Sequence, residues 1–88
     1  ITNGGIIEKY IVYGLSSCSY CVRVVNRLIE EKKSFYVELL DNNPERLKLL
    51  KIMYEHPTVP IVVLKKEKET LLGGCDDTMK HLNGEARQ

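Results

Sequence analysis

Two cysteines three positions apart, Cys18 and Cys21 in "SSCSYC" (16–21), restrict the folds open to this chain more than any other feature. The preceding segment 6–14, "IIEKYIVYG", is β-branched and aromatic and predicts a strand largely buried on both faces near its end. The following segment, about 20–32, has the apolar periodicity of a helix. The pair is therefore expected at a strand-to-helix junction. Unpaired backbone N–H groups and the helix dipole at that junction favour a thiolate at Cys18.

The first predicted helix has one apolar face. Its apolar residues recur at helical spacing and are expected to pack together against the sheet: Cys21, Val22, Val25, Leu28 and Ile29. The next segment, "SFYVELL" (34–40), returns to the composition of a strand.

A second helix is predicted after this strand. Asn43 is expected to cap it, and Pro44 to occupy its first position, where the missing N–H costs nothing. Pro57 ends the segment. The buried side of this helix is expected to comprise Leu47, Leu50 and either Met53 or Tyr54.

The last third of the chain predicts a hairpin followed by a short helix. Segments 60–64 and 70–72 are apolar and strand-like, and "KKEKE" (65–69) is typical of a solvated turn. The expected cap, inward residues and end of the last helix are Asp76 or Asp77, Met79 and Leu82, and "NG" at 83–84.

The predicted order is β-α-β-α-β-β-α, an α/β fold with a four-stranded mixed sheet flanked by helices. The crossover rule makes the first two strands parallel, and the last two form an antiparallel hairpin. Eighty-eight residues leave room for one core, so a single domain over 1–88 is expected, with residues 1–5 frayed.

Composition excludes several classes of function. A formal net charge of +1 gives no electrostatic reason to expect binding to nucleic acid or to an anionic membrane. No apolar run approaches the ~20 residues that span a bilayer. Three cysteines, an odd number, argue against a secreted disulfide scaffold. A reducing, cytoplasmic location is expected, and the "ITNGG" start is also compatible with a removed organellar targeting segment.

Four uses of the cysteine pair compete. A zinc site needs a second ligand pair nearby, and the remaining candidates, His56, Cys75 and His81, are far apart in the sequence, so no metal site is expected. A structural disulfide would close a very short loop and stabilise little. Inert thiols are less expected at a helix start. A redox couple fits best, because a thiolate attacks a disulfide and a thiol three residues on can release the mixed disulfide.

Two later stretches are ambiguous from their residues alone. Pro60, after "TV", is more typical of an ordinary strand-opening proline than of a cis bond. The stretch "GGCDD" (73–77) favours a simple turn and cap, and its alternative use is a carboxylate site. In that alternative, the N–H groups of Cys75 and Asp76 face a ligand at a helix start.

Together these stretches resemble the glutaredoxins. The pattern is a leading strand, "CSYC", "TVP" some 40 residues further on, and "GGCDD" before a last helix, and it covers about 8–84 of the chain. The resemblance implies a thioredoxin-like fold and a cis bond between Val59 and Pro60.

The resemblance also implies roles at the matching positions. Cys18 would be the nucleophile that accepts a glutathionyl group, and Cys21 the resolving thiol. The implied glutathione contacts are Tyr20 beside its sulfur; Thr58, Val59 and Pro60 along its backbone, with Val59 pairing through its main chain; and Gly74, Cys75 and Asp76 at its γ-glutamyl end. Asp77 is expected to be a helix cap instead.

The implied activity is reduction of protein disulfides and glutathione mixed disulfides by a monomer, with glutathione as co-substrate. Two positions depart from the family pattern: Leu15 replaces a common lysine, and Leu47 a usual polar or basic residue. The candidates to replace the lost charge are Arg46, Lys48 and Lys51.

Two alternatives remain open. The lost basic positions favour a thioredoxin-like electron donor, for example to ribonucleotide reductase, fed by a flavin reductase. Ser19 replaces the proline of many family members, and some members with "CSYC" bridge a [2Fe–2S] cluster between two subunits with glutathione. A cluster carrier with Cys18 as a ligand is therefore the other alternative. Cys75 is expected to be a semi-buried bystander in preference to a regulatory thiol.

Overall fold

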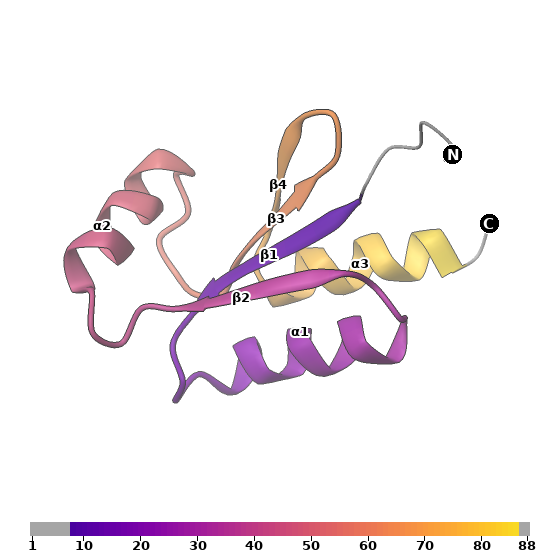
Figure 1. Ribbon diagram of the computed structural model, residues 1–88, viewed down its shortest axis with the longest axis horizontal. Coiled ribbons are helices and arrows are strands. Elements are labelled where there is room, and N and C mark those ends of the chain that lie inside the picture. The colour runs from indigo at the N-terminus through magenta and orange to yellow at the C-terminus, as the bar shows by residue number, and fades with distance from the viewer. Residues whose placement is uncertain (1–7, 87–88) are drawn as a thin grey trace.

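The computed structural model describes residues 8–86 and contains one mixed sheet with helices on both faces (Figure 1). The elements are β1 Lys9–Gly14, α1 Ser19–Glu30, β2 Phe35–Leu39, α2 Pro44–Met53, β3 Ile61–Lys65, β4 Glu69–Gly73 and α3 Cys75–Ala86. The predicted order of elements is confirmed. The frayed end expected at 1–5 and the first two residues of the predicted strand 6–14 lie outside the described residues. Within 8–86, no helix is long and apolar enough to cross a bilayer.

The sheet has the strand order β2-β1-β3-β4, with β1 in the middle. The strand β1 pairs in parallel with β2 and antiparallel with β3, and β3 and β4 form the predicted hairpin. Val12, Tyr13 and Gly14 are buried, as expected for a strand covered on both faces near its end. β1 is therefore held by neighbours on four sides.

The helices α1 and α3 cover one face of the sheet, and they lie side by side in Figure 1. The predicted apolar face of α1 is partly wrong. Cys21, Val24 and Leu28 are buried, whereas Val22 and Ile29 are 52% and 57% exposed. The spacing of apolar residues along the helix does not indicate where the sheet that covers it ends. Since β2 is an edge strand, Val22 borders an open groove instead of the core.

The helix α2 covers the other face. The Asn43 side chain accepts a hydrogen bond from the Arg46 N–H (3.2 Å), which confirms the predicted cap. Leu50 is fully packed, Leu47 and Tyr54 join the same cluster, and Met53 is exposed. Of the two residues proposed for the last buried position, Tyr54 therefore occupies it.

The helix α3 differs from its prediction at both ends. It begins at Cys75, so both aspartates lie inside its first turn, and Asp77 reaches back to accept from the Gly74 N–H (3.4 Å). The prediction that this helix ends at 83–84 is wrong, and the helix continues to Ala86. Glycine costs about 1 kcal/mol in a helix without ending it, and the neighbouring Asn83 is held by a contact from α1.

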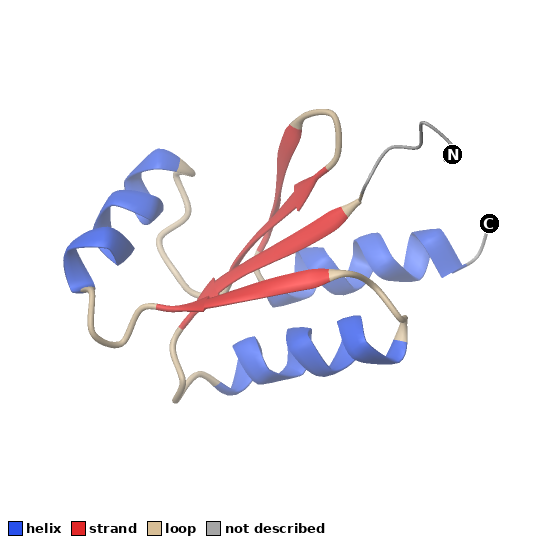
Figure 2. Ribbon diagram, viewed as in Figure 1, coloured by secondary structure: helices blue, strands red, loops and turns tan. Residues whose placement is uncertain are grey.

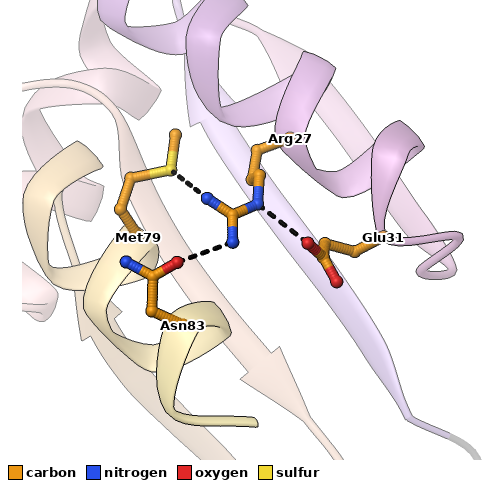
Figure 3. A network of polar contacts seen from close by, with 4 residues as sticks. All are labelled: Arg27, Glu31, Met79 and Asn83. Carbon is orange, nitrogen blue, oxygen red and sulfur yellow. Dashed lines mark hydrogen bonds and ion pairs between the residues drawn. The ribbon is translucent and has the colours of Figure 1, made fainter. Parts of the chain in front are cut away.

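That contact comes from Arg27, which links α1 to α3 (Figure 3). Its guanidinium donates to Glu31 (3.0 Å) on its own helix, and to Asn83 Oδ1 (2.7 Å) and Met79 Sδ (3.8 Å) on α3. Because a guanidinium presents several donors in a fixed plane, one side chain holds both helices in register.

Replacing Arg27 with alanine is expected to destabilise the protein by about 1 kcal/mol, since it removes partly exposed, charge-assisted hydrogen bonds. The melting temperature should fall by roughly 4–8 °C in a domain of this size. Thermal unfolding followed by circular dichroism measures this. Asn26→Ala, on the exposed side of the same helix, is the control and should change the melting temperature little. Equal effects of the two substitutions would contradict the bridge.

Candidate active site

Three chain segments meet where strands β1, β3 and β4 end or begin, at one end of the sheet. The register pairs Tyr13 of β1 with Ile61 of β3, and Val62 of β3 with Gly73 of β4. The end of β1, the start of β3 and the end of β4 are therefore neighbours, and these strand ends converge in Figure 2. This arrangement brings the cysteine pair, the "TVP" segment and the "GGCDD" segment to one place.

Cys18 is the N-cap residue of α1, as predicted. Its backbone is extended (φ −85°, ψ 111°), and its Sγ accepts a hydrogen bond from the Cys21 N–H at 3.2 Å. The sulfur therefore takes the position of a capping oxygen, against the N–H groups of the first turn. Its side chain is only partly buried, so a substrate can reach it.

Cys21 lies one turn deeper and is only 4% exposed. Burial, followed by the hydrogen bond with the Cys18 side chain, raises its pKa to about 12, and the Leu15 backbone N–H opposes this shift. The two thiols thus differ in accessibility and in capping role, with the first at the surface and the second in the core.

The loop before Cys18 is held by a carboxylate. Asp41, just after β2, accepts hydrogen bonds from the Ser16 N–H (3.0 Å) and the Ser16 hydroxyl (2.6 Å). These bonds, the side-chain one first, hold the pKa of Asp41 below its usual value. A turn closed by the Cys18 N–H and the Leu15 carbonyl (3.1 Å) completes the loop.

A groove of about 630 Å³ lies beside the pair, within the usual range of about 300–1,000 Å³ for small-molecule sites. Its lining residues come from α1, the segment before β3, and the start of α3: Tyr20, Arg23, His56, Thr58, Val59, Pro60, Gly74, Cys75, Asp76 and Asp77. All seven residues named as glutathione contacts line this groove. The two thiols do not: Cys18 caps the adjoining helix, and Cys21 lines a separate apolar hollow of about 270 Å³ at the β2 edge.

The Val59–Pro60 peptide bond is cis, as the family resemblance implied and contrary to the preference drawn from the residues alone. The segment is fixed by His56, which the sequence analysis did not select as a site residue. Its Nδ1–H donates to the Thr58 carbonyl (2.8 Å). The other side of its ring faces Gly74, where an added Cβ would lie 3.4 Å from His56 Cε1. His56 therefore connects two walls of the groove.

Arg23 is the second site residue that sequence reasoning missed. Its guanidinium lies over the Tyr20 ring, 5.5 Å from the centroid, and is near enough to Cys75 to affect the pKa of that thiol. Burial raises the pKa of the Cys75 thiol, and the charge of Arg23 opposes that shift. One signal was present in the sequence: Arg23 follows Tyr20 by three residues, so the two share a helix face.

Leu15 and Leu47 pack into the apolar cluster beneath α2 and do not line the groove. None of the three basic residues considered as replacements lines it either, and Arg46 is engaged with Glu38 through two of its nitrogens. Among the described residues that line the groove, Arg23 alone belongs to the Lys/Arg class.

Within residues 8–86, no group of three or more His, Cys, Asp or Glu side chains is placed to hold a metal ion. The cluster-carrier alternative gains no support from the described part of the chain.

Comparisons with known proteins agree on one family. Residues 10–68 match the family model described as Glutaredoxin. The chain is 32% identical over 78 residues to glutaredoxin 1 of Rickettsia prowazekii, covering 85% of this chain and 78% of that protein. It is 34% identical over 77 residues to glutaredoxin 1 of Rickettsia conorii, covering 84% and 72%. The structure of a wheat glutaredoxin superposes with a TM-score of 0.73 at 30% identity, covering 81% of this chain and 67% of that one, which confirms the thioredoxin-like fold.

The two thiols should differ in their reaction with iodoacetamide, because only a thiolate reacts. With a pKa of about 12, Cys21 is ionised to only about 1% at pH 10, and its alkylation rate should rise about tenfold per pH unit up to that pH. Cys18, the more accessible of the two, should be labelled first at pH 7.5. Peptide mapping by mass spectrometry after short exposures measures both rates. A plateau in Cys21 labelling near pH 8 would contradict the raised pKa.

Proposed function

The chain belongs to the glutaredoxin family and is a thiol–disulfide oxidoreductase, and from this premise we propose that glutathione is its electron donor. The proposed substrates are glutathione mixed disulfides and protein disulfides. The observation that carries the proposal is the position of Cys18, the N-cap of α1, beside a groove that ends at the first turn of α3.

In the proposed reaction, the Cys18 thiolate attacks the glutathione sulfur of a glutathionylated protein. A Cys18–glutathione disulfide forms, and the protein thiolate leaves and takes up a proton. The thiolate of a second glutathione then attacks the bound glutathione sulfur, which releases glutathione disulfide and regenerates Cys18. Of the two active-site thiols, this cycle needs only Cys18.

A protein disulfide needs both thiols. Cys18 attacks it and becomes joined to the client, and Cys21 then attacks the Cys18 sulfur and releases the second client thiol. The resulting Cys18–Cys21 disulfide is reduced by two glutathione molecules. Because Cys21 is buried and protonated, it gives up its proton to the leaving thiolate during this second attack.

We place the glutathione backbone along Thr58, Val59 and Pro60, with the γ-glutamyl carboxylate at the N–H groups that begin α3. A helix start offers unpaired N–H donors and the positive end of the dipole, which suits a carboxylate. Arg23 adds a full positive charge to this end of the groove. Leu15 and Leu47, which pack beneath α2, bring no charge to the groove, so recognition is proposed to depend more on the γ-glutamyl end.

The proposed setting is a monomer in a reducing compartment, the cytoplasm in the first instance, because the oxidised pair must be returned to the dithiol. Disulfide-containing or glutathionylated proteins are its proposed clients, ribonucleotide reductase among those to be tried.

Cysteine variants test the proposal with a glutathionylated peptide and, separately, with a protein disulfide. In an assay coupled to glutathione reductase, Cys18→Ser should lose both activities, because the attacking thiol is absent. Cys21→Ser should keep turning over the peptide and lose reduction of the protein disulfide. If glutathione supports not even the wild type, the packed Leu15 and Leu47 favour the thioredoxin-like alternative. A flavin-dependent thioredoxin reductase should then supply the electrons.

Replacement of Arg23 by glutamine should raise the KM for glutathione about tenfold. Loss of one charge-assisted hydrogen bond costs about 1.5–3 kcal/mol when it is well formed, and a partly exposed one lies at the low end. Steady-state kinetics with varied glutathione measure the change. Lys48→Gln removes the same charge from the exposed surface of α2 and should leave KM unaltered. Equal effects of the two variants would show that only net charge matters.

A further inference from the structure

We infer that Gly14, the last residue of β1, is a positioning residue for the resolving thiol. Its lack of a side chain leaves the space that the Cys21 sulfur occupies, in the position from which that sulfur can reach Cys18. This inference rests on the proposed role of Cys21 in the two-thiol reaction. It adds a requirement outside the cysteine pair and the groove.

The structure leaves no free space for a side chain at Gly14. A Cβ built there would lie 2.5 Å from Cys21 Sγ and 3.2 Å from Cys21 Cβ, and real Cβ atoms essentially never approach another heavy atom within 3.0 Å. Both residues are buried, and Cys21 is only 4% exposed.

The backbone does not explain the glycine. Among the described glycines, only Gly73 has a positive φ (117°). Gly14 pairs with Leu39 as an ordinary residue of the parallel ladder, and its carbonyl accepts from the Leu40 N–H at 2.9 Å. An alanine is therefore allowed by the main chain at this position, and the obstacle to it is the Cys21 side chain, which would have to move.

Three residues lie close to Cys21. An added Cβ at Gly14 would meet its sulfur, and Leu15 and Cys18 are near enough to affect its pKa. The Cys21 N–H donates to Cys18 Sγ (3.2 Å), so the two residues whose sulfurs must bond are already in contact. In the resolving step Cys21 Sγ attacks Cys18 Sγ, a Cys18–Cys21 bond forms, and the bond from Cys18 to the client sulfur breaks. The client thiolate takes the proton released by Cys21.

A methyl group at position 14 occupies the place of this sulfur, so Cys21 must turn to another rotamer or α1 must shift. Cys18 has no such contact with Gly14, because it lies outside the strand at the helix cap. The one-thiol reaction should therefore survive a substitution that disables the two-thiol reaction.

The test compares Gly14→Ala with Gly84→Ala, a matched control in α3 whose added Cβ meets nothing within 4 Å. Gly14→Ala should lose about a hundredfold in the rate of protein disulfide reduction, because a displacement of about 1 Å at a reacting group can cost that much. Its rate of peptide deglutathionylation should remain within about twofold of the wild type. Gly84→Ala should match the wild type in both assays.

A second readout uses no glutathione. Both proteins are equilibrated in mixtures of reduced and oxidised dithiothreitol, and the fraction carrying the Cys18–Cys21 disulfide is measured by mass spectrometry. Gly14→Ala should need a more oxidising mixture than the wild type. An unchanged midpoint together with an unchanged rate of protein disulfide reduction would overturn the inference. If glutathione does not reduce the wild type, the proposed electron donor is wrong. The equilibrium test with dithiothreitol still decides the role of Gly14.

Should Gly14→Ala fail to fold, the double variant Gly14→Ala/Cys21→Ala decides the matter. Recovery of a cooperative unfolding transition in the double variant supports a clash with the sulfur, because the second substitution removes only that atom. Failure of the double variant to fold, while Cys21→Ala alone folds, would overturn the inference, since the obstacle would then lie elsewhere.

Discussion

Burial of β1 between two apolar layers is the constraint on which the rest of the structure depends. Tyr10 and Val12 pack towards α1 and α3, and Tyr13 packs in the cluster beneath α2. A strand held on both faces and by hydrogen bonds along both edges cannot slide without exposing one of these layers. Its end at Gly14 is therefore a fixed point, and only three residues separate it from Cys18. The core thus places the attacking sulfur.

The same fixed point separates the properties of the two thiols. One turn of helix carries Cys21 into the core beside Gly14, where burial keeps it protonated, and leaves Cys18 at the cap, where N–H groups face it. Charge around the groove is distributed just as unevenly. Its permanent cation, Arg23, belongs to α1 and lies against Tyr20 and Cys75, while Leu15 and Leu47 contribute apolar packing to the other layer.

Local patterns predicted what local physics controls. The order of elements, the cap at Asn43 and the cap at Cys18 each depend on neighbouring residues, and each is confirmed. The wrong predictions concern features that depend on segments distant in the chain. Val22 is exposed because the sheet ends at β2, and α3 passes Gly84 with its preceding turn held by Arg27. Arg23 and His56 were not predicted as site residues because each also faces a residue distant in the chain, Arg23 facing Cys75 and His56 facing Gly74.

The sequence by itself determined that a reactive pair of thiols begins a helix after a buried strand, because hydrophobic periodicity and capping act over a few residues. The family resemblance added the cis bond at Pro60 and seven of the residues that line the groove. Only the tertiary structure decided which apolar residues are covered, which cation faces the groove, and why the strand ends in glycine. These depend on the distance between atoms far apart in the chain, and close packing tolerates no extra methyl group where the Cys21 sulfur already fills the space.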